Sequence, residues 1–171
     1  AGWQTASARV ESSTFGGGSW LAHSSLLSGL RIADQGHYHD LLTSDRATLA
    51  SRFAAAGYRS VALMPGLRHP WPEGQFYGFD RIFDAKSLEY RGPAYGGWEI
   101  PDQYSLYRLH QIELAPSGRP PLLVFFPTIN SHAPFSPLPP YRSDWSQVAA
   151  GSDATLPSSG AVKLSERLDG E

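Results

Sequence analysis

The sequence of 171 residues contains no cysteine. This absence excludes disulfide bonds, thiolate metal sites and cysteine nucleophiles, and it leaves both oxidising and reducing compartments open. There is no run of eighteen apolar residues, and residues 1–4 have neither the basic nor the apolar part of a signal peptide. We therefore expect a soluble chain that reaches a membrane only through segments absent from it.

Strong charge of either sign is also lacking. The formal net charge is -2, with 14 basic and 16 acidic residues and no basic run. This balance argues against nucleic acid or an anionic membrane surface as the main partner. The length and a hydrophobic content of 41% fit one domain with a buried core.

A run of three glycines ends at Gly18 and is followed by Ser19 and a helix-like segment, Ser19–Leu30. Glycine lets the backbone come close to a ligand, and the first turn of a helix exposes free N–H groups. The motif therefore predicts an anion site at Gly17 and Gly18 with Ser19 as a possible nucleophile. Composition alone favours the alternative, a glycine-rich surface turn before a structural helix, for which Gly29 is the expected C-cap.

Helices and strands alternate further along the chain. A helix that ends at Gly57 is predicted after the N-cap candidates in Thr43–Asp45, and the strand Tyr58–Met64 follows it directly. The short apolar run Leu122–Phe126 predicts a strand buried on both faces. This order is typical of an α/β fold with a mostly parallel sheet flanked by helices.

The remaining segments are less regular. Residues 8–12 predict a short strand, and Gln103–Leu114 predicts a helix. Gly66–Gly97 is a long loop, whose one regular piece is residues 80–83 and which is of the kind that carries a site or a lid. We expect a core over residues 1–145 and a polar linker, weak helix or tail over residues 146–171.

Several side chains are candidates for chemistry. His132 follows the strand ending at Phe126, at the sheet edge where open α/β folds bind ligands. Arg68, His69 and Trp71 share one proline-rich loop and could hold an oxyanion, or form a solvated loop with an aromatic plug. His37, His39 and His110 are expected to be ordinary surface or core residues. Nucleotide-binding and GxSxG motifs are absent.

Four segments in order resemble the sulfatase and alkaline phosphatase superfamily. Ser19–Gly29 resembles the sulfatase signature, in which Cys or Ser is followed by x-Pro-Ser-Arg and then Leu-Leu-Thr-Gly. The others are the helix and strand over Thr48–Ser60, the Gly-Phe-Asp turn in Tyr77–Asp80 and the Thr-x-x-x-His-x-Pro-Phe segment in Thr128–Pro137. The likeness is strongest to the membrane-anchored branch of lipoteichoic acid synthases and phosphoethanolamine transferases.

The resemblance implies roles for individual residues. Ser19 falls on the nucleophile, which also binds metal, and His23 falls on the signature arginine. His132 falls on the histidine that contacts the transferred group. By a looser analogy, Trp71 with Arg68 or His69 would hold a phosphate head group. The implied cofactor is a divalent metal, Mn, Zn, Mg or Ca, and the implied location is periplasmic or extracytoplasmic.

The implied function is a sulfatase-like hydrolase or transferase acting on a phosphodiester, phosphate or sulfate ester of a small molecule, lipid or glycan. Ser19 lacks the Cys or Pro-Ser-Arg context of formylglycine maturation, which favours phosphoryl chemistry with an unmodified hydroxyl. No Asp-His strand follows Trp145, so the alkaline-phosphatase-like domain is expected to be incomplete. The alternatives are a non-catalytic anion- or glycan-binding module and a purely structural domain.

Overall fold

The structure is a computed structural model that describes residues 4–15, 17–95, 97–134 and 136–150. The predicted tail lies mostly outside these residues, and only a short helix, α5 (Trp145–Ala150), falls at its start. Within the described residues, no helix has the length and apolar character needed to cross a membrane.

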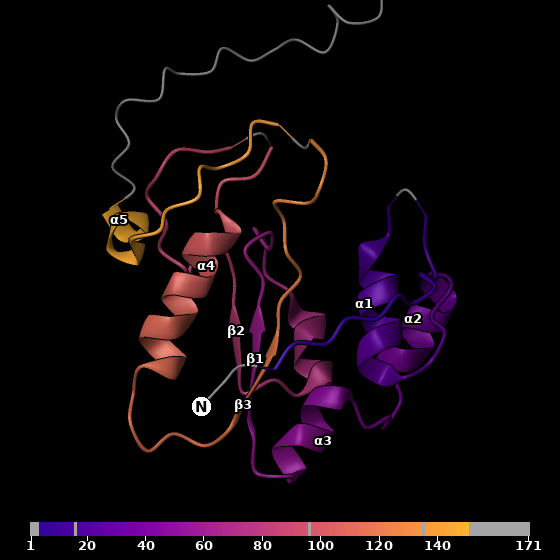
Figure 1. Cartoon of the computed structure of the whole chain (residues 1–171). Coiled ribbons are helices and arrows are strands. Elements are labelled where there is room, and N and C mark those ends of the chain that lie inside the picture. Colours follow the sequence, from indigo (N-terminus) through magenta and orange to yellow (C-terminus); the bar gives the residue numbers. More distant parts are fainter. Residues whose placement is uncertain (1–3, 16, 96, 135, 151–171) are drawn as a thin grey trace, which may run out of the picture.

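A three-stranded parallel sheet forms the centre of the fold (Figure 1). Its strands are β1 (Arg59–Leu63), β2 (Arg81–Phe83) and β3 (Leu122–Phe125), in the order β2-β1-β3. In the register, Val61 lies opposite both Arg81 of β2 and Val124 of β3. The predicted α/β class with a parallel sheet flanked by helices is confirmed.

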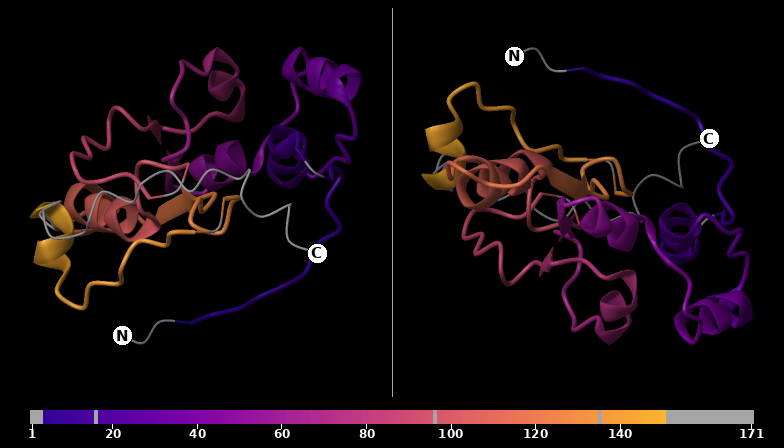
Figure 2. Two further views of the ribbon diagram at one scale, coloured as in Figure 1. Left: turned by 90° about the horizontal axis from the view of Figure 1, so that it is seen from above. Right: turned by 90° about the horizontal axis from the view of Figure 1, so that it is seen from below.

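Helices flank the sheet on two sides (Figures 1 and 2). On one side lie α4 (Asp102–Leu109) and α5; on the other lies α3 (Leu49–Ala55), with α1 (Ser19–Ser28) and α2 (Gln35–Leu42) beyond it. The main core lies between the sheet and α4, and a smaller apolar cluster joins α1 to α2. The buried residues of the main core include Val61, Leu63, Phe83, Leu88, Ile100, Tyr104 and Leu109.

Strand β3 corrects one prediction, because it is not buried on both faces. All of its residues are half-buried, whereas Val61, Ala62 and Leu63 of β1 are fully buried. The physical reason is position: β1 has a strand on either side, whereas β3, among the described strands, pairs with β1 alone and forms an edge of the sheet.

The strand predicted over residues 8–12 is also wrong. This segment is extended but pairs with no strand in the described part of the chain, and Val10 is 79% exposed. A strand is held by hydrogen bonds to a neighbour and by one buried face, and a single apolar residue between polar ones supplies neither.

Helix α3 begins later than predicted. Its N-cap is Thr48 rather than a residue of Thr43–Asp45, because Thr48 and Ser51 form a capping box. The predicted end at Gly57 is confirmed: Gly57 has φ 82°, and the N–H of Tyr58 donates to the carbonyl of Phe53. The rings of Phe53 and Tyr58 then pack 4.9 Å apart across the cap.

Two helices were not predicted. α2 begins at an N-cap, Asp34, whose carboxylate accepts from the N–H of His37. A 3-10 helix, η1 (Pro72–Tyr77), interrupts the long loop. Its proline and glycine favoured a loop prediction, yet proline suits the first position of such a helix, and Gly78 ends it in a left-handed conformation.

The predicted helix Gln103–Leu114 forms as α4 followed by a π-helical turn, η2 (His110–Leu114). This turn brings Glu113 to Arg59 of β1. Nε of Arg59 lies 2.6 Å from one carboxylate oxygen of Glu113, and a terminal nitrogen lies 2.8 Å from the other. The pair thereby ties the end of the helix to the central strand.

This ion pair predicts acid-sensitive stability. Its hydrogen bonds hold the pKa of the buried Glu113 carboxyl below its ordinary value of 4.5. The stabilisation is therefore present above pH 4.5 and is lost as the pH falls through the lowered folded-state pKa. We expect Glu113→Gln to lower the free energy of unfolding by on the order of 2 kcal/mol at pH 7.

Urea denaturation of both proteins between pH 7 and pH 3 measures this effect. The difference between wild type and Glu113→Gln should shrink toward acid pH, because protonation removes the same interaction. A difference that stays constant with pH would show that the pair contributes only through packing.

Candidate functional site

A cavity of about 550 Å³ lies at the carboxyl edge of the sheet, where the loops after β1 and β3 leave their strands. It is bounded by α1, by η1 and by both loops. The lining residues are mostly aromatic or apolar. They are Ser19, Trp20, His23, Leu27, Gln35, Tyr38, Met64, Gly66, Leu67, Trp71, Glu73, Tyr77, Trp98, Phe125, Pro127, Thr128, Ile129 and His132.

Helix α1 contributes one face and its N-terminus to this cavity. Gly18 is the N-cap residue in the left-handed conformation with φ 65°, and it offers no side-chain cap. Ser19 is therefore the first helical residue, at a helix end where the carbonyl of Gly18 accepts from the N–H of Leu21. Trp20, His23 and Leu27 follow at helical spacing and line the same wall.

His23 is a half-buried histidine in the cavity wall that α1 forms. Its ring packs edge-on against Phe125 at the end of β3, with 5.5 Å between ring centroids. Burial lowers the pKa of His23 from its ordinary value of 6.5. The neutral form therefore predominates at pH 7, so His23 does not supply the fixed positive charge that the signature arginine would.

His132 lies on the opposite side, in the loop after β3. Its Nδ1 is 2.7 Å from the carbonyl oxygen of Ala133, and its ring packs edge-on to Trp98 at 4.8 Å. A carbonyl oxygen only accepts hydrogen bonds, so Nδ1 carries the proton. In the neutral ring, Nε2 is then the nitrogen that can take up a proton.

Asp102 holds this loop in place. Its carboxylate oxygens accept from the N–H groups of Ile129, at 2.9 Å, and Asn130, at 3.1 Å. In return the side-chain oxygen of Asn130 accepts from the N–H of Asp102 at 2.8 Å. The loop backbone has no ladder partner there, so these bonds fix the path of the chain toward His132.

The floor of the cavity is a second buried network. Ser24 donates to the carbonyl oxygen of Trp20, so its oxygen accepts from the hydroxyl of Tyr77 at 2.7 Å. Burial raises the pKa of Tyr77 to about 12, so this phenol stays neutral. Trp71 packs on Tyr77 with 5.4 Å between ring centroids.

The structure thus brings four of the eight predicted site residues into one cavity: Ser19, His23, Trp71 and His132. Gly17, Gly18, Arg68 and His69 are not among its lining residues. Arg68 lies near the wall, 5.8 Å from the ring of Trp98, and donates to the carbonyl of Gly97. His69 is exposed in the loop before η1.

The implied divalent metal does not fit the described residues. They contain no group of three or more His, Cys, Asp or Glu side chains that could hold an ion. Zinc sites in proteins take three or four such ligands. Ser19, predicted to bind the metal, therefore has no set of described partners with which to share it.

Sequence reasoning missed several members of the site. Tyr77 comes from the long loop, Trp98 follows its end directly, and Asp102 precedes the predicted helix Gln103–Leu114. A motif could not have identified them, since their partners Ala133, Ser24 and Ile129 lie 27 to 53 residues away. The richness of the loop in aromatic residues was the one available signal.

The burial of His23 gives a testable titration. We expect its imidazole to titrate below pH 6.5, because the cavity wall desolvates the charged form. Proton NMR of the histidine ring resonances between pH 4 and pH 8 measures the midpoint, and the resonance missing from His23→Gln assigns it. A midpoint at or above 6.5 would mean that the ring is solvated.

No protein-family model and no curated protein matches the sequence. A crystal structure of a protein in the alkaline phosphatase superfamily from Vibrio parahaemolyticus is similar to this chain, with a TM-score of 0.45 and 18% sequence identity. The similarity covers 75% of this chain and 36% of that one, so this chain spans about a third of the neighbour's length.

Proposed function

We propose that this chain is part of a sulfatase-like hydrolase or transferase that acts on a phosphate, phosphodiester or sulfate ester. The observation that carries the proposal is the meeting of Ser19 and His132 in one cavity at the carboxyl edge of a parallel sheet. These residues lie 113 positions apart, and the same two were selected from the sequence resemblance. The resemblance adds a lipid- or glycan-linked substrate and a periplasmic location.

In this proposal, Oγ of Ser19 attacks the phosphorus or sulfur atom of the ester. A bond forms from Oγ to that atom as the bond to the alcohol leaving group breaks. His132 supplies Nε2 for the serine proton, because Nδ1 is engaged with Ala133. The positive end of the α1 dipole, at Ser19, favours the negative charge on the transferred group.

The wall of the cavity suits the organic part of the ester. Among the described residues, the lining includes three tryptophans, Trp20, Trp71 and Trp98, but no lysine or arginine, and Glu73 is its one carboxylate. The part of the substrate that binds against this wall is therefore uncharged. The anionic part of the substrate lies near Ser19 or beside Arg68 at the rim of the cavity.

Ser19→Ala tests the nucleophile. We expect turnover of a nitrophenyl phosphodiester by the full-length protein to fall by at least about a thousandfold, because Oγ of Ser19 is the atom that attacks the ester. Ser117→Ala, in an exposed turn before β3, is the matched control and should keep full activity. Unchanged turnover in Ser19→Ala would refute the assignment.

A second candidate function is a non-catalytic module that binds anions or glycans. The lack of a metal-holding group among the described residues favours it. Calorimetric titration with a non-hydrolysable phosphonate diester, together with metal analysis of the purified chain, separates the two. Binding with neither turnover nor bound metal would support the module, and stoichiometric Mn²⁺ or Zn²⁺ would count against it.

A further inference from the structure

Trp98 lies between the two loops that border the cavity of Ser19. It lines this cavity together with Gly66, from the loop after β1, and His132, from the loop after β3. A side chain at Gly66 would meet the ring of Trp98 at 3.5 Å and the side chain of Ile129 at 3.3 Å. The glycine therefore leaves the space in which the indole ring packs between both loops.

The backbone of Trp98 is fixed by a β-bridge to Tyr95. The N–H of Trp98 donates to the carbonyl of Tyr95 at 3.1 Å, and its carbonyl accepts from the N–H of Tyr95 at 2.9 Å. The guanidinium of Arg68 lies over the indole ring, 5.8 Å from the ring centroid, and donates to the carbonyl of Gly97 at 2.9 Å. The indole ring is therefore held in place before a substrate binds.

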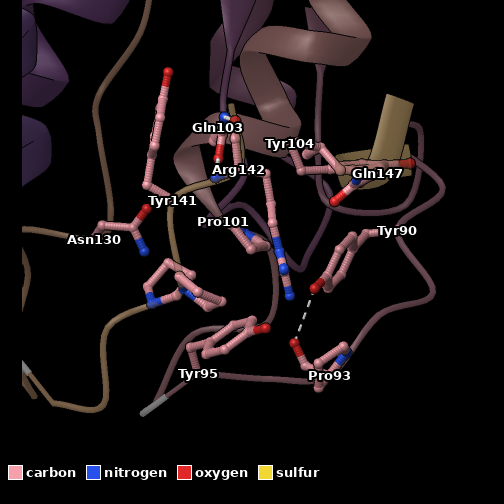
Figure 3. Close-up of a pocket in the computed structure, with 13 residues that line it drawn as sticks. Tyr90, Pro93, Tyr95, Pro101, Gln103, Tyr104, Asn130, Tyr141, Arg142 and Gln147 are labelled. Atoms are coloured by element: carbon pink, nitrogen blue, oxygen red, sulfur yellow. Dashed lines mark hydrogen bonds between the residues drawn. The ribbon is translucent and has the colours of Figure 1, made fainter. Parts of the chain in front are cut away.

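The segments that carry Trp98 and His132 also meet on a second side of the fold. There, Tyr95 and Asn130 both line a smaller cavity of about 220 Å³, which lies against α4 (Figure 3). Asp102, at the start of α4, accepts from the N–H of Asn130. Contacts on both sides therefore fix how the two segments lie relative to each other.

The carbonyl oxygen of Ala133 connects Trp98 to His132. It accepts from Nε1 of Trp98 at 3.3 Å and lies 2.7 Å from Nδ1 of His132. A carbonyl oxygen has two lone pairs, so it can accept from both N–H groups, but it cannot donate. This shared acceptor therefore selects the form of His132 that carries its proton on Nδ1.

His132 depends on these contacts because it is exposed, so burial does not hold its ring. Trp98 packs edge-on against the imidazole, with 73° between the ring planes and 4.8 Å between the centroids. This contact opposes the rotation that would take Nδ1 away from the carbonyl of Ala133. Ring packing and the shared carbonyl thus favour the same orientation.

We propose that Trp98 is a positioning residue that holds His132 with its proton on Nδ1 and with Nε2 unprotonated. The catalytic consequence rests on the proposed function, in which Nε2 takes the proton of Ser19. An imidazole with its proton on Nε2 would be a donor at that position and could not act as the base. Trp98 itself transfers no proton.

Nitrogen-15 NMR of the full chain at pH 9 tests the proposal without a measurement of activity. At this pH a histidine ring is neutral, and the chemical shifts of its two nitrogens show which one carries the proton. The resonances missing from His132→Gln assign the ring. We expect the Nδ1–H form to exceed the Nε2–H form about tenfold, a ratio that one hydrogen bond to a carbonyl supports.

Two variants separate the contacts of Trp98. Trp98→Leu removes both the aromatic ring and the N–H donor, so the ratio should fall about tenfold, to near-equal populations. Trp98→Phe keeps a ring without the donor, so the ratio should fall about threefold, and it carries the test if the leucine variant does not fold. Trp145→Leu, at the exposed start of α5, is the matched control and should keep the wild-type ratio.

Two results would overturn the proposal. The first is a wild-type ring with its proton mainly on Nε2, since the carbonyl of Ala133 would then not accept from Nδ1. The second is a wild-type ratio in the folded Trp98 variants, since the imidazole would then keep its form without the indole. Failure of the proposed function looks different: unchanged turnover in Ser19→Ala would refute the function, while a ratio that responds to Trp98 would still support its positioning role.

Discussion

The burial of β1 from Ser60 to Leu63 is the constraint on which the rest of the structure depends. Val61, Ala62 and Leu63 are fully buried, and parallel strands pair with both edges of β1. An apolar strand enclosed in this way needs helices over both faces, and α3 and α4 supply them. Parallel pairing also sends the chain out of β1 and β3 at the same edge, where the loop residues Gly66 and His132 meet around the main cavity.

Polar side chains then hold the irregular segments, whose backbone groups have no ladder partner. Asp102 binds the loop after β3, and Asp80 accepts from both the N–H and the hydroxyl of the buried Ser60. Asp102 is half-buried and Asp80 is exposed, so these bonds act mainly by fixing the path of the loop backbone.

Much of the fold was predictable because it depends on local patterns. The strand Tyr58–Met64, the helix before it and its end at Gly57 follow from a short apolar run and a glycine that takes positive φ. The burial of β3 was predicted wrongly, since an apolar run indicates that a strand has buried surface but not that both of its faces are covered. How many neighbours it has depends on the order of strands in the sheet. The strand predicted over residues 8–12 does not form for a similar reason: a strand needs a partner that the local sequence does not specify.

The candidate site was likewise predictable only in part. By itself, the sequence determined the α/β class. It also determined which side chains could take part in binding or catalysis, including those of Ser19, His23 and His132, because side-chain chemistry and periodicity are local properties. Only the tertiary structure decided that Ser19 and His132 share a cavity, that burial keeps His23 neutral, and that Trp98 packs against His132. Cavities form between segments far apart in the chain, so their shape and desolvation come from packing, which no local pattern records.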